Sequence, residues 1–311
     1  MASETSKQAE INVVTGAFGY TGKYITHLLL ASGVQVKTLT GHPERPDPFG
    51  NQVIAVPFNF DDPAALIDEL SGATALYNTY WVRFCRGEVS FDRAVENSKT
   101  LVRAAKEAGV GRIVHVSITN PSLDSSLPYF NGKAQVEKAI IASGVSYAIV
   151  RPTVVFGVED ILINNIAWLL RRFPLFILPG QGGYRFQPIF VEDLAEIAVD
   201  AGGEKDNLVI DAAGPEVYTL DEFVRLIGQT MGSKSKVVHL PPGLALGLPK
   251  IVGVFLGDVV LTRDEVTGLM SDLLISNAPP AGKTSLKSWL RENLATLSGQ
   301  YASELAHHYR R

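Results

Sequence analysis

The sequence predicts an α/β fold in which a doubly wound parallel sheet carries helices on both faces, with a smaller C-terminal part. Three observations predict it. The chain has 311 residues, 46% hydrophobic and 19% charged, which is enough to bury a large core. Short β-branched runs alternate with helical patterns through the first half, as in βαβ units. A run of glycines follows the first strand directly.

The elements of the first half follow one another in a regular order. β-branched and apolar runs predict strands at 11–15, 34–39, 52–58, 74–80, 112–118 and 146–152. Apolar residues at helical spacing, each stretch closed by a glycine, predict helices between them at 21–33, 63–72, 92–108 and 131–143.

Beyond residue 157 the alternation loosens. An apolar and aromatic segment, 161–190, leads to a helix near 191–201, and Thr219 with Glu222 forms a capping box that opens another helix. The last 40 residues have a helical pattern, with one apolar face made of Leu286, Trp289, Leu290 and Leu294.

Composition excludes several classes of protein. The net charge of −4 and pI of about 5.9 give no reason to expect a nucleic-acid partner. Cys85 is the only cysteine, so no internal disulfide forms. The first ten residues are polar and lack the apolar core of a signal peptide, which favours a cytoplasmic location.

We expect no transmembrane segment. The nearest candidate, 241–261, is broken by Pro249, Lys250 and Asp258. It is interpreted as a core helix or a cover over the substrate, with contact to a membrane surface as the alternative.

The stretch "VVTGAFGYTGKYI" places Gly16, Gly19 and Gly22 between a strand and a helix. A tight turn and the close approach of a pyrophosphate both require residues without a Cβ, and the helix N-terminus supplies free N–H groups. The pattern predicts a dinucleotide-binding (Rossmann) domain over 10–157, preceded by a flexible tail, 1–9. Residues 158–311 are expected to form a smaller, mainly helical substrate-binding part interwoven with it. The expected loop contacts to the cofactor are Gly16, Phe18, Gly19, Tyr20, Thr21 and Gly22.

The end of the second strand bears on which dinucleotide binds. It lacks the immediate acid that usually holds the ribose of NAD, whereas Arg45, with His42, could meet the 2′-phosphate of NADP. We therefore favour NADP (NADPH), and NAD stays an alternative because Glu44 could hold the ribose. Asn59 and Phe60 follow the third strand, where the adenine edge is expected, and Asp62 is expected to cap the next helix.

Several motifs together resemble the short-chain dehydrogenase/reductase superfamily, in its extended or atypical branch (NAD(P)-dependent epimerase/dehydratase-like). These are the glycine loop, "NTYW", "ENSKTLVRAAKEAGVGRIVHVSIT", the Tyr129–Lys133 pair, "IVRPTVVFG", "QPIFVEDLAEIA" and "GPEVYTLDEF". The nearest subgroup is similar to the nucleotide-binding accessory subunit of mitochondrial complex I. Some members of that subgroup serve as structural or assembly subunits.

The resemblance implies roles for particular residues. Tyr129 would give or take the proton, and Lys133 would bind the nicotinamide ribose and lower the pKa of the tyrosine. Four residues apart on a helix, the two side chains share one face. Either Ser117 or Thr119 would polarise the carbonyl. The strand ends that would contact the cofactor carry Thr79, Tyr80, Pro152, Thr153 and Val154.

The residues expected at the substrate are mostly aromatic, which favours a small apolar or aromatic carbonyl compound such as a quinone. They are Trp81, Phe84, Phe156, Asn164, Trp168 and Arg185. The histidines show no H-E-x-x-H pattern, so no metal site is expected.

The leading hypothesis is an NAD(P)-dependent oxidoreductase of the short-chain dehydrogenase/reductase type. A dinucleotide-binding sensor or assembly subunit without turnover is the alternative, and a nucleotide-sugar epimerase or dehydratase is a third. The expected partner is a small-molecule substrate, and a homodimer built on a helix pair, common in the superfamily, stays open.

Overall fold

The computed structural model describes residues 10–83, 85, 87–241, 263–293 and 297. The chain divides into two compact units. Unit 1 comprises residues 1–151 and 195–210, and unit 2 comprises 152–194 and 211–311. The expected tail 1–9, most of the candidate segment 241–261, Phe84 and Leu294 lie outside the described residues.

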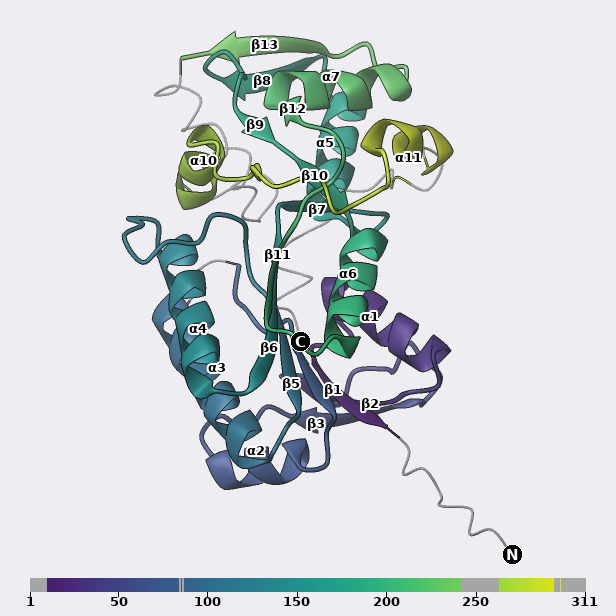
Figure 1. Ribbon diagram of the computed structural model, residues 1–311. Helices are drawn as coiled ribbons and strands as arrows, with labels where there is room; N and C mark the ends of the chain where they lie inside the picture. The colour runs from purple at the N-terminus through teal and green to yellow at the C-terminus, as the bar shows by residue number, and fades with distance from the viewer. Residues whose placement is uncertain (1–9, 84, 86, 242–262, 294–296, 298–311) are drawn as a thin grey trace, which may run out of the picture. The chain divides into compact units, whose positions relative to one another are not determined.

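Unit 1 is built on a seven-stranded sheet with the order β11-β6-β5-β4-β1-β2-β3. Six of the strands pair side by side in parallel. Helices α2, α3 and α4 lie on one side of the sheet, and α1 and α6 lie on the other (Figure 1). The predicted doubly wound fold is therefore confirmed. The strands are β1 (Ile11–Thr15), β2 (Gln35–Thr40), β3 (Val53–Pro57), β4 (Ala75–Asn78), β5 (Arg112–Val116), β6 (Ser146–Pro152) and β11 (Leu208–Ala212).

The helices of unit 1 lie close to the predicted ranges. They are α1 (Tyr20–Ala31), α2 (Pro63–Leu70), α3 (Phe91–Glu107), α4 (Pro128–Ser143) and α6 (Val191–Gly203). Asp62 caps α2 by accepting from the Ala65 N–H at 3.2 Å, as expected. Gly144 ends α4 with a left-handed φ of 77°. Helix α4 begins three residues earlier than predicted because Pro128 suits the first helical position, so Tyr129 lies in its first turn.

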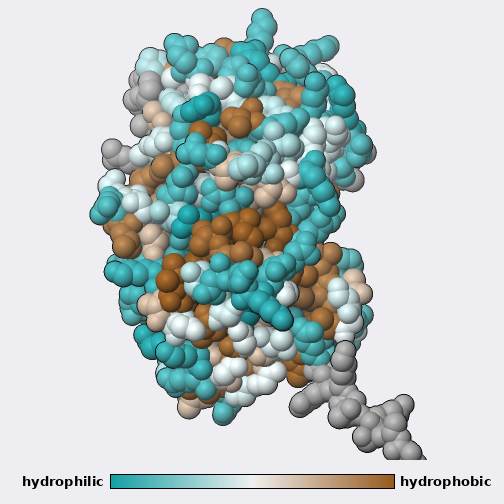
Figure 2. Space-filling model, in the orientation of Figure 1, coloured by the Kyte–Doolittle hydropathy of each residue, from teal (hydrophilic) through white to brown (hydrophobic). Residues whose placement is uncertain are grey.

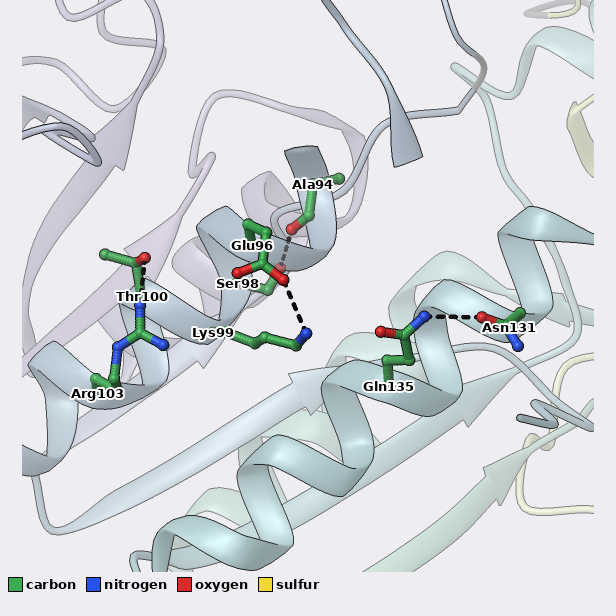
Figure 3. A network of polar contacts seen from close by, with 8 residues as sticks. All are labelled: Ala94, Glu96, Ser98, Lys99, Thr100, Arg103, Asn131 and Gln135. Carbon is green, nitrogen blue, oxygen red and sulfur yellow. Dashed lines mark hydrogen bonds and ion pairs between the residues drawn. The ribbon is translucent and has the colours of Figure 1, made fainter. Parts of the chain in front are cut away.

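Helices α3 and α4 pack side by side, and short-range polar contacts line both of them (Figure 3). Lys99 pairs with Glu96 at 2.8 Å, and Gln135 donates to Asn131 at 2.8 Å. These contacts join residues three or four positions apart on one helix, so they support each helix rather than the pairing. The pairing itself rests on buried apolar residues such as Val95 and Val136.

Unit 2 combines four described helices with three two-stranded sheets. The helices are α5 (Ile161–Arg172), α7 (Leu220–Thr230), α10 (Arg263–Met270) and α11 (Leu286–Asn293). The sheets pair β7 (Val154–Phe156) with β10 (Pro188–Phe190), β9 (Arg185–Phe186) with β12 (Tyr218–Thr219), and β8 (Leu175–Pro179) with β13 (Lys236–Leu240). The predicted capping box is present at the start of α7, where Thr219 and Glu222 bond each other's backbone N–H.

The core of unit 2 is aromatic. Phe156 packs on Trp289 with ring centroids 5.4 Å apart, and Phe186 packs on Phe223 at 4.8 Å. Within the described ranges, no helix has the length and apolar character needed to cross a membrane.

Candidate functional site

The three glycines of the loop after β1 each have a separate structural reason. Gly16 adopts φ +67°, a conformation that side chains disfavour. Gly19 donates its N–H to the Gly16 carbonyl at 2.8 Å, and a Cβ at this position would lie only 3.2 Å from the same oxygen. A Cβ on Gly22 would lie 2.2 Å from the Gly16 carbonyl oxygen, so only glycine lets α1 pack this close to the turn. The loop is thus compact against the start of α1.

The N-terminus of α1 fits an anionic group. Its N-cap is Gly19, which has no side chain to bond the first N–H groups, and its first turn has no acidic residue. These N–H groups and the positive end of the helix dipole favour a pyrophosphate. Hydrogen bonds to β2 also stabilise the turn, since the Thr38 hydroxyl accepts from the Ala17 N–H at 3.0 Å and donates to the Val14 carbonyl at 2.8 Å. The described residues therefore fit a dinucleotide.

Polar contacts connect the ends of β1 and β4. The Thr15 hydroxyl accepts from the N–H groups of Thr79 and Tyr80 at 2.7 and 2.9 Å. The Thr79 hydroxyl donates to the Thr15 carbonyl at 2.5 Å and lies 3.6 Å from the position of a Cβ on Gly16. Thr79 and Tyr80, expected at the cofactor, are thereby brought beside the glycine loop.

An open hollow of about 430 Å³ lies at the end of β3, where the adenine was expected. Phe58 and Phe60 stack with centroids 4.8 Å apart, and the Tyr80 ring contacts both at 5.0 Å. Asn59 adopts a left-handed φ of 49°, which turns the chain around the hollow. The lining residues are Phe58, Asn59, Phe60, Asp61, Asp62 and Arg93. Phe58 was not predicted, although it stands in an F-N-F pattern after the strand.

Both candidates for the ribose contact lie on one turn after β2. His42 Nδ1 is 3.6 Å from a Glu44 carboxylate oxygen, and the Arg45 N–H donates to the His42 carbonyl at 3.2 Å. Glu44 and Arg45 are both exposed. The turn thus presents an acid and a cation side by side, and the preference for NADP over NAD stays a prediction.

Tyr129 and Lys133 share one face of α4, and the Trp81 indole contacts both. The Tyr129 ring meets Trp81 edge to face at 5.8 Å, and the Lys133 Nζ lies 4.6 Å from the Trp81 ring centroid. A Cβ on Gly132 would lie 2.9 Å from the tip of that indole, so glycine is required for this packing. The pair and the aromatic residue after β4 form one cluster within unit 1.

The Lys133 ammonium is almost completely buried, with 2% of the residue exposed. It donates to the Val116 carbonyl at the end of β5, at 2.8 Å. Burial lowers the pKa of Lys133 to about 7, and the neighbouring Glu137 carboxylate partly opposes that shift. The side chain can therefore change its charge near neutral pH.

A buried carboxylate, which the sequence analysis did not single out, lies one turn beyond Lys133. Glu137 accepts from the Ser117 hydroxyl at 2.5 Å and from the Arg151 guanidinium at 3.0 and 2.6 Å. The sequence could have pointed to Glu137 through its spacing, because a residue four positions after Lys133 lies on the same helix face. The Ser117 hydroxyl is thus already hydrogen-bonded to a carboxylate. Thr119 is fully buried, and within the described part of the chain its hydroxyl has no hydrogen-bond partner.

The residues expected further along the chain lie in unit 2. Thr153 donates its hydroxyl to the Gln187 carbonyl and its N–H to the Ala212 carbonyl. Phe156 is fully buried in the aromatic core, which leaves it no surface for a substrate. Asn164 donates to the carbonyls of Val158 and Asp160. Pro152 and Val154 lie in β6 and β7.

The two remaining expected substrate residues of unit 2 are more accessible. Arg185 is exposed and pairs with Asp272 at 2.8 Å. Trp168 is half-buried and contacts Phe173 with centroids 5.8 Å apart. Their role at a substrate stays a prediction.

Comparison with known proteins agrees with this geometry. The model of a family described as NAD(P)H-binding matches residues 16–158. These residues form an NAD(P)H-binding domain. The match begins at the first glycine of the loop and ends just after β7, so it includes the hollow, the Tyr129–Lys133 pair and Glu137.

Two similar relatives extend over most of the chain. NADH dehydrogenase [ubiquinone] 1 alpha subcomplex subunit 9, mitochondrial, of Arabidopsis thaliana is 24% identical over 286 residues, covering 86% of this chain and 71% of the relative. The mouse (Mus musculus) protein of the same name is 26% identical, covering 88% and 76%. The resemblance to this complex I subunit, inferred from the motifs, is confirmed.

Solved structures share the fold. A triphenylmethane reductase of Citrobacter sp. superposes with a TM-score of 0.72 at 17% identity, covering 92% of this chain and 99% of that one. An NADPH-dependent quinone oxidoreductase of Escherichia coli, complexed with NADPH, gives 0.70 at 20% identity, covering 91% and 99%.

The expected cytoplasmic location is wrong. The relatives of Arabidopsis, Dictyostelium, Neurospora and mouse are named as mitochondrial proteins or subunits, which points away from the cytoplasm. The expectation failed because the lack of a signal-peptide core argues only against secretion and does not single out the cytosol.

Proposed function

We propose that the protein is an NAD(P)H-dependent oxidoreductase acting on a small, largely apolar carbonyl or alcohol, with NADPH preferred. One observation carries the proposal. The Tyr129–Lys133 pair stands on the helix after β5, in the same unit as the glycine loop, with Trp81 packed on both side chains. An ordinary surface tyrosine and lysine would not share an aromatic contact under which the lysine is buried.

The dinucleotide would be held along the ends of β1 to β4. The glycine loop and the start of α1 would bind the pyrophosphate, and the hollow beside Phe58 and Phe60 would take the adenine. His42 and Arg45 would meet a 2′-phosphate. The bound nicotinamide supplies or accepts the hydride.

The proton would be handled by residues of α4 and β5. Tyr129 would donate its hydroxyl proton to the carbonyl oxygen during reduction and take it back during oxidation. The Lys133 ammonium, stabilised over the Trp81 face, would favour the tyrosinate that remains. Ser117 and Thr119 stay alternatives for polarising the carbonyl: the Ser117 hydroxyl already bonds Glu137, and the Thr119 hydroxyl, which has no partner among the described residues, is fully buried.

The aromatic cluster favours an apolar substrate. Trp81, Phe91 and Tyr129 meet one another with centroids 5.8 to 6.3 Å apart. Aromatic faces bind flat apolar rings through dispersion and edge-to-face contacts. A quinone or an aromatic ketone therefore matches this surface better than a sugar nucleotide does.

Turnover tests the proposal. NADPH oxidation is followed with a panel of quinones and aromatic ketones for the wild type, Tyr129→Phe and a matched control, Tyr147→Phe, in the strand after α4. We expect activity in the wild type and control, and a loss of about 100-fold or more in kcat for Tyr129→Phe. Equal activity in all three proteins would remove the assigned role of Tyr129.

Titration with NADPH and NADH separately tests the cofactor. We expect tighter binding of NADPH, with the difference reduced in Arg45→Ala and unchanged in Arg103→Ala, which lies on α3 outside the hollow. Comparable affinities in the wild type would contradict the NADP preference.

A second function is favoured by a different observation. The relatives named above are subunits of a respiratory complex, so this chain could bind the dinucleotide as a structural element and have a protein partner. The engagement of Ser117 by Glu137 is compatible with that role. Tight NADPH binding without turnover of any panel member, together with co-purification in a larger complex, would support it.

A further inference from the structure

The small sheet of β8 and β13 in unit 2 has one buried and one exposed face. Phe176 and Val237, which are paired in register, pack against the core of unit 2, and Leu178 on the same side is 2% exposed. The other side carries Leu175 and Ile177, because side chains alternate along a strand. Helix α7, which contacts β13, lies across the buried face (Figure 1).

The exposed face is apolar along β8. Phe173, Leu175 and Ile177 are 46%, 50% and 37% exposed. Leu175 and Ile177 occupy alternate positions of β8 and so lie on one side of the strand, and Phe173, with extended backbone, precedes them at the same spacing. Single exposed apolar residues are ordinary, but a contiguous row on one side of a strand marks a contact surface.

Cations border this row. Lys236 is exposed and is the register partner of Leu175, which places it on the same face. Lys234 precedes it on the loop and is exposed, and Arg172 is exposed at the end of α5. Two hydrogen bonds hold the lysine loop beside the row: Ser233 donates to the Leu170 carbonyl at 2.6 Å, and the Lys236 N–H donates to the Pro174 carbonyl at 2.9 Å.

The chain segments that carry the apolar row and its cations lack acidic residues. The protein as a whole is acidic, with a net charge of −4, yet residues 161–191 and 223–241 contain no aspartate or glutamate. Their other arginines are directed elsewhere: Arg185 pairs with Asp272, Arg225 pairs with Asp221, and Arg171 donates to the Leu297 carbonyl. In the space-filling view, hydrophilic residues surround small apolar patches at the end of unit 2 that carries this sheet (Figure 2).

We propose that this face, made of Phe173, Leu175, Ile177, Arg172, Lys234 and Lys236, binds the surface of an anionic lipid bilayer. Apolar side chains would enter the interface, while the lysine and arginine head groups would stay at the level of the phosphates. This binding is independent of the proposed oxidoreductase reaction. It would bring the protein to the phase in which apolar substrates such as quinones dissolve.

A second copy of the chain fits this face less well. In a symmetric dimer the same patch meets itself, so the three cations of one copy would oppose those of the other. An anionic bilayer instead complements both properties of the surface at once, its charge and its apolar row.

Co-sedimentation with vesicles tests the proposal on the full-length protein. One set of vesicles is phosphatidylcholine alone, and the other contains phosphatidylserine in addition. We expect binding to the anionic set, weakened by salt. The double variant Lys234→Gln/Lys236→Gln should lose roughly 25-fold in partition coefficient, about fivefold for each lysine. Leu175→Ser should lose about fivefold or more through the apolar contact.

Matched controls change the same residue types in unit 1. Lys106→Gln/Lys138→Gln removes the same charge from α3 and α4, and Ile54→Ser replaces an apolar residue that is 65% exposed on β3. Both should bind vesicles like the wild type. Absence of binding to the anionic vesicles, equal binding to both sets, or equal losses in variants and controls would overturn the proposal. NADPH binding measured on each protein verifies folding, and separates this outcome from failure of the proposed reaction.

Discussion

The Glu137→Gln substitution tests the buried charge cluster on α4 most directly. Glu137 is 5% exposed and bonds Ser117 and Arg151, and it lies one turn from the buried Lys133 ammonium. The glutamine keeps nearly the same volume and one acceptor oxygen but removes the negative charge. Arg151 then loses its counter-charge, and the pKa of Lys133, which the Glu137 carboxylate raises, falls further.

The expected loss of stability is estimated from the burial of the ion pair. Removing one partner of a buried ion pair costs about 3–5 kcal/mol, because the other charge is left without compensation. The Arg151 side chain is 29% exposed and can be hydrated in part, and the new amide can still accept a hydrogen bond. We therefore expect a loss near the lower end, about 3 kcal/mol in the free energy of unfolding.

Urea unfolding at neutral pH measures the loss. The control is Glu96→Gln on α3, whose carboxylate pairs with Lys99 at 2.8 Å but is 65% exposed, so its loss should be at most about 1 kcal/mol. Adding Arg151→Met to Glu137→Gln should recover part of the stability, because the stranded cation is gone. The reasoning is refuted if Glu137→Gln costs no more than Glu96→Gln, or if the double variant loses the sum of both single losses.

Three further predictions concern the loop, the lysine and a cap. Gly22→Ala should weaken NADPH binding at least about tenfold in a fluorescence titration, because its Cβ would lie 2.2 Å from the Gly16 carbonyl oxygen. The control Gly203→Ala, which has open space around its Cβ, should bind NADPH like the wild type. The pKa of Lys133 is lowered from 10.5 to about 7, so between these pH values the unfolded chain binds more protons than the folded one and the free energy of unfolding rises with pH. Lys133→Met should lose that rise in urea unfolding measured from pH 7 to 10, and an unchanged slope would contradict the assignment. Thr219→Ala should cost about 1 kcal/mol of unfolding free energy through the lost capping box while NADPH affinity stays constant; a change in affinity would show that the cap is coupled to the cofactor site.

Local signals were sufficient for much of the fold. The alternation of strands and helices, the glycine loop, the Asp62 cap and the Thr219 capping box all depend on residues within a few positions of one another. Their physics is local, since φ/ψ preference, side-chain period and capping act over one or two turns. The parallel sheet followed from them because short connections leave few topologies.

Local signals placed Tyr129 and Lys133 on one helix face but not their surroundings. Lys133 takes its carbonyl partner from β5 and its aromatic contact from the residue after β4, and burial by those elements lowers its pKa. None of these contacts has a sequence spacing that identifies it. The engagement of Ser117 by Glu137 is of the same kind, since the two are 20 positions apart.

By itself, then, the sequence determined the NAD(P)H-binding sheet, the glycine turn and the helix that carries Tyr129 and Lys133. Only the tertiary structure decided that Trp81 covers the lysine, that a buried carboxylate holds Ser117 and Arg151, and that the outward row of β8 lies beside Lys234 and Lys236. The reason is that desolvation and charge pairing depend on distance in space, and segments far apart in the chain create those distances.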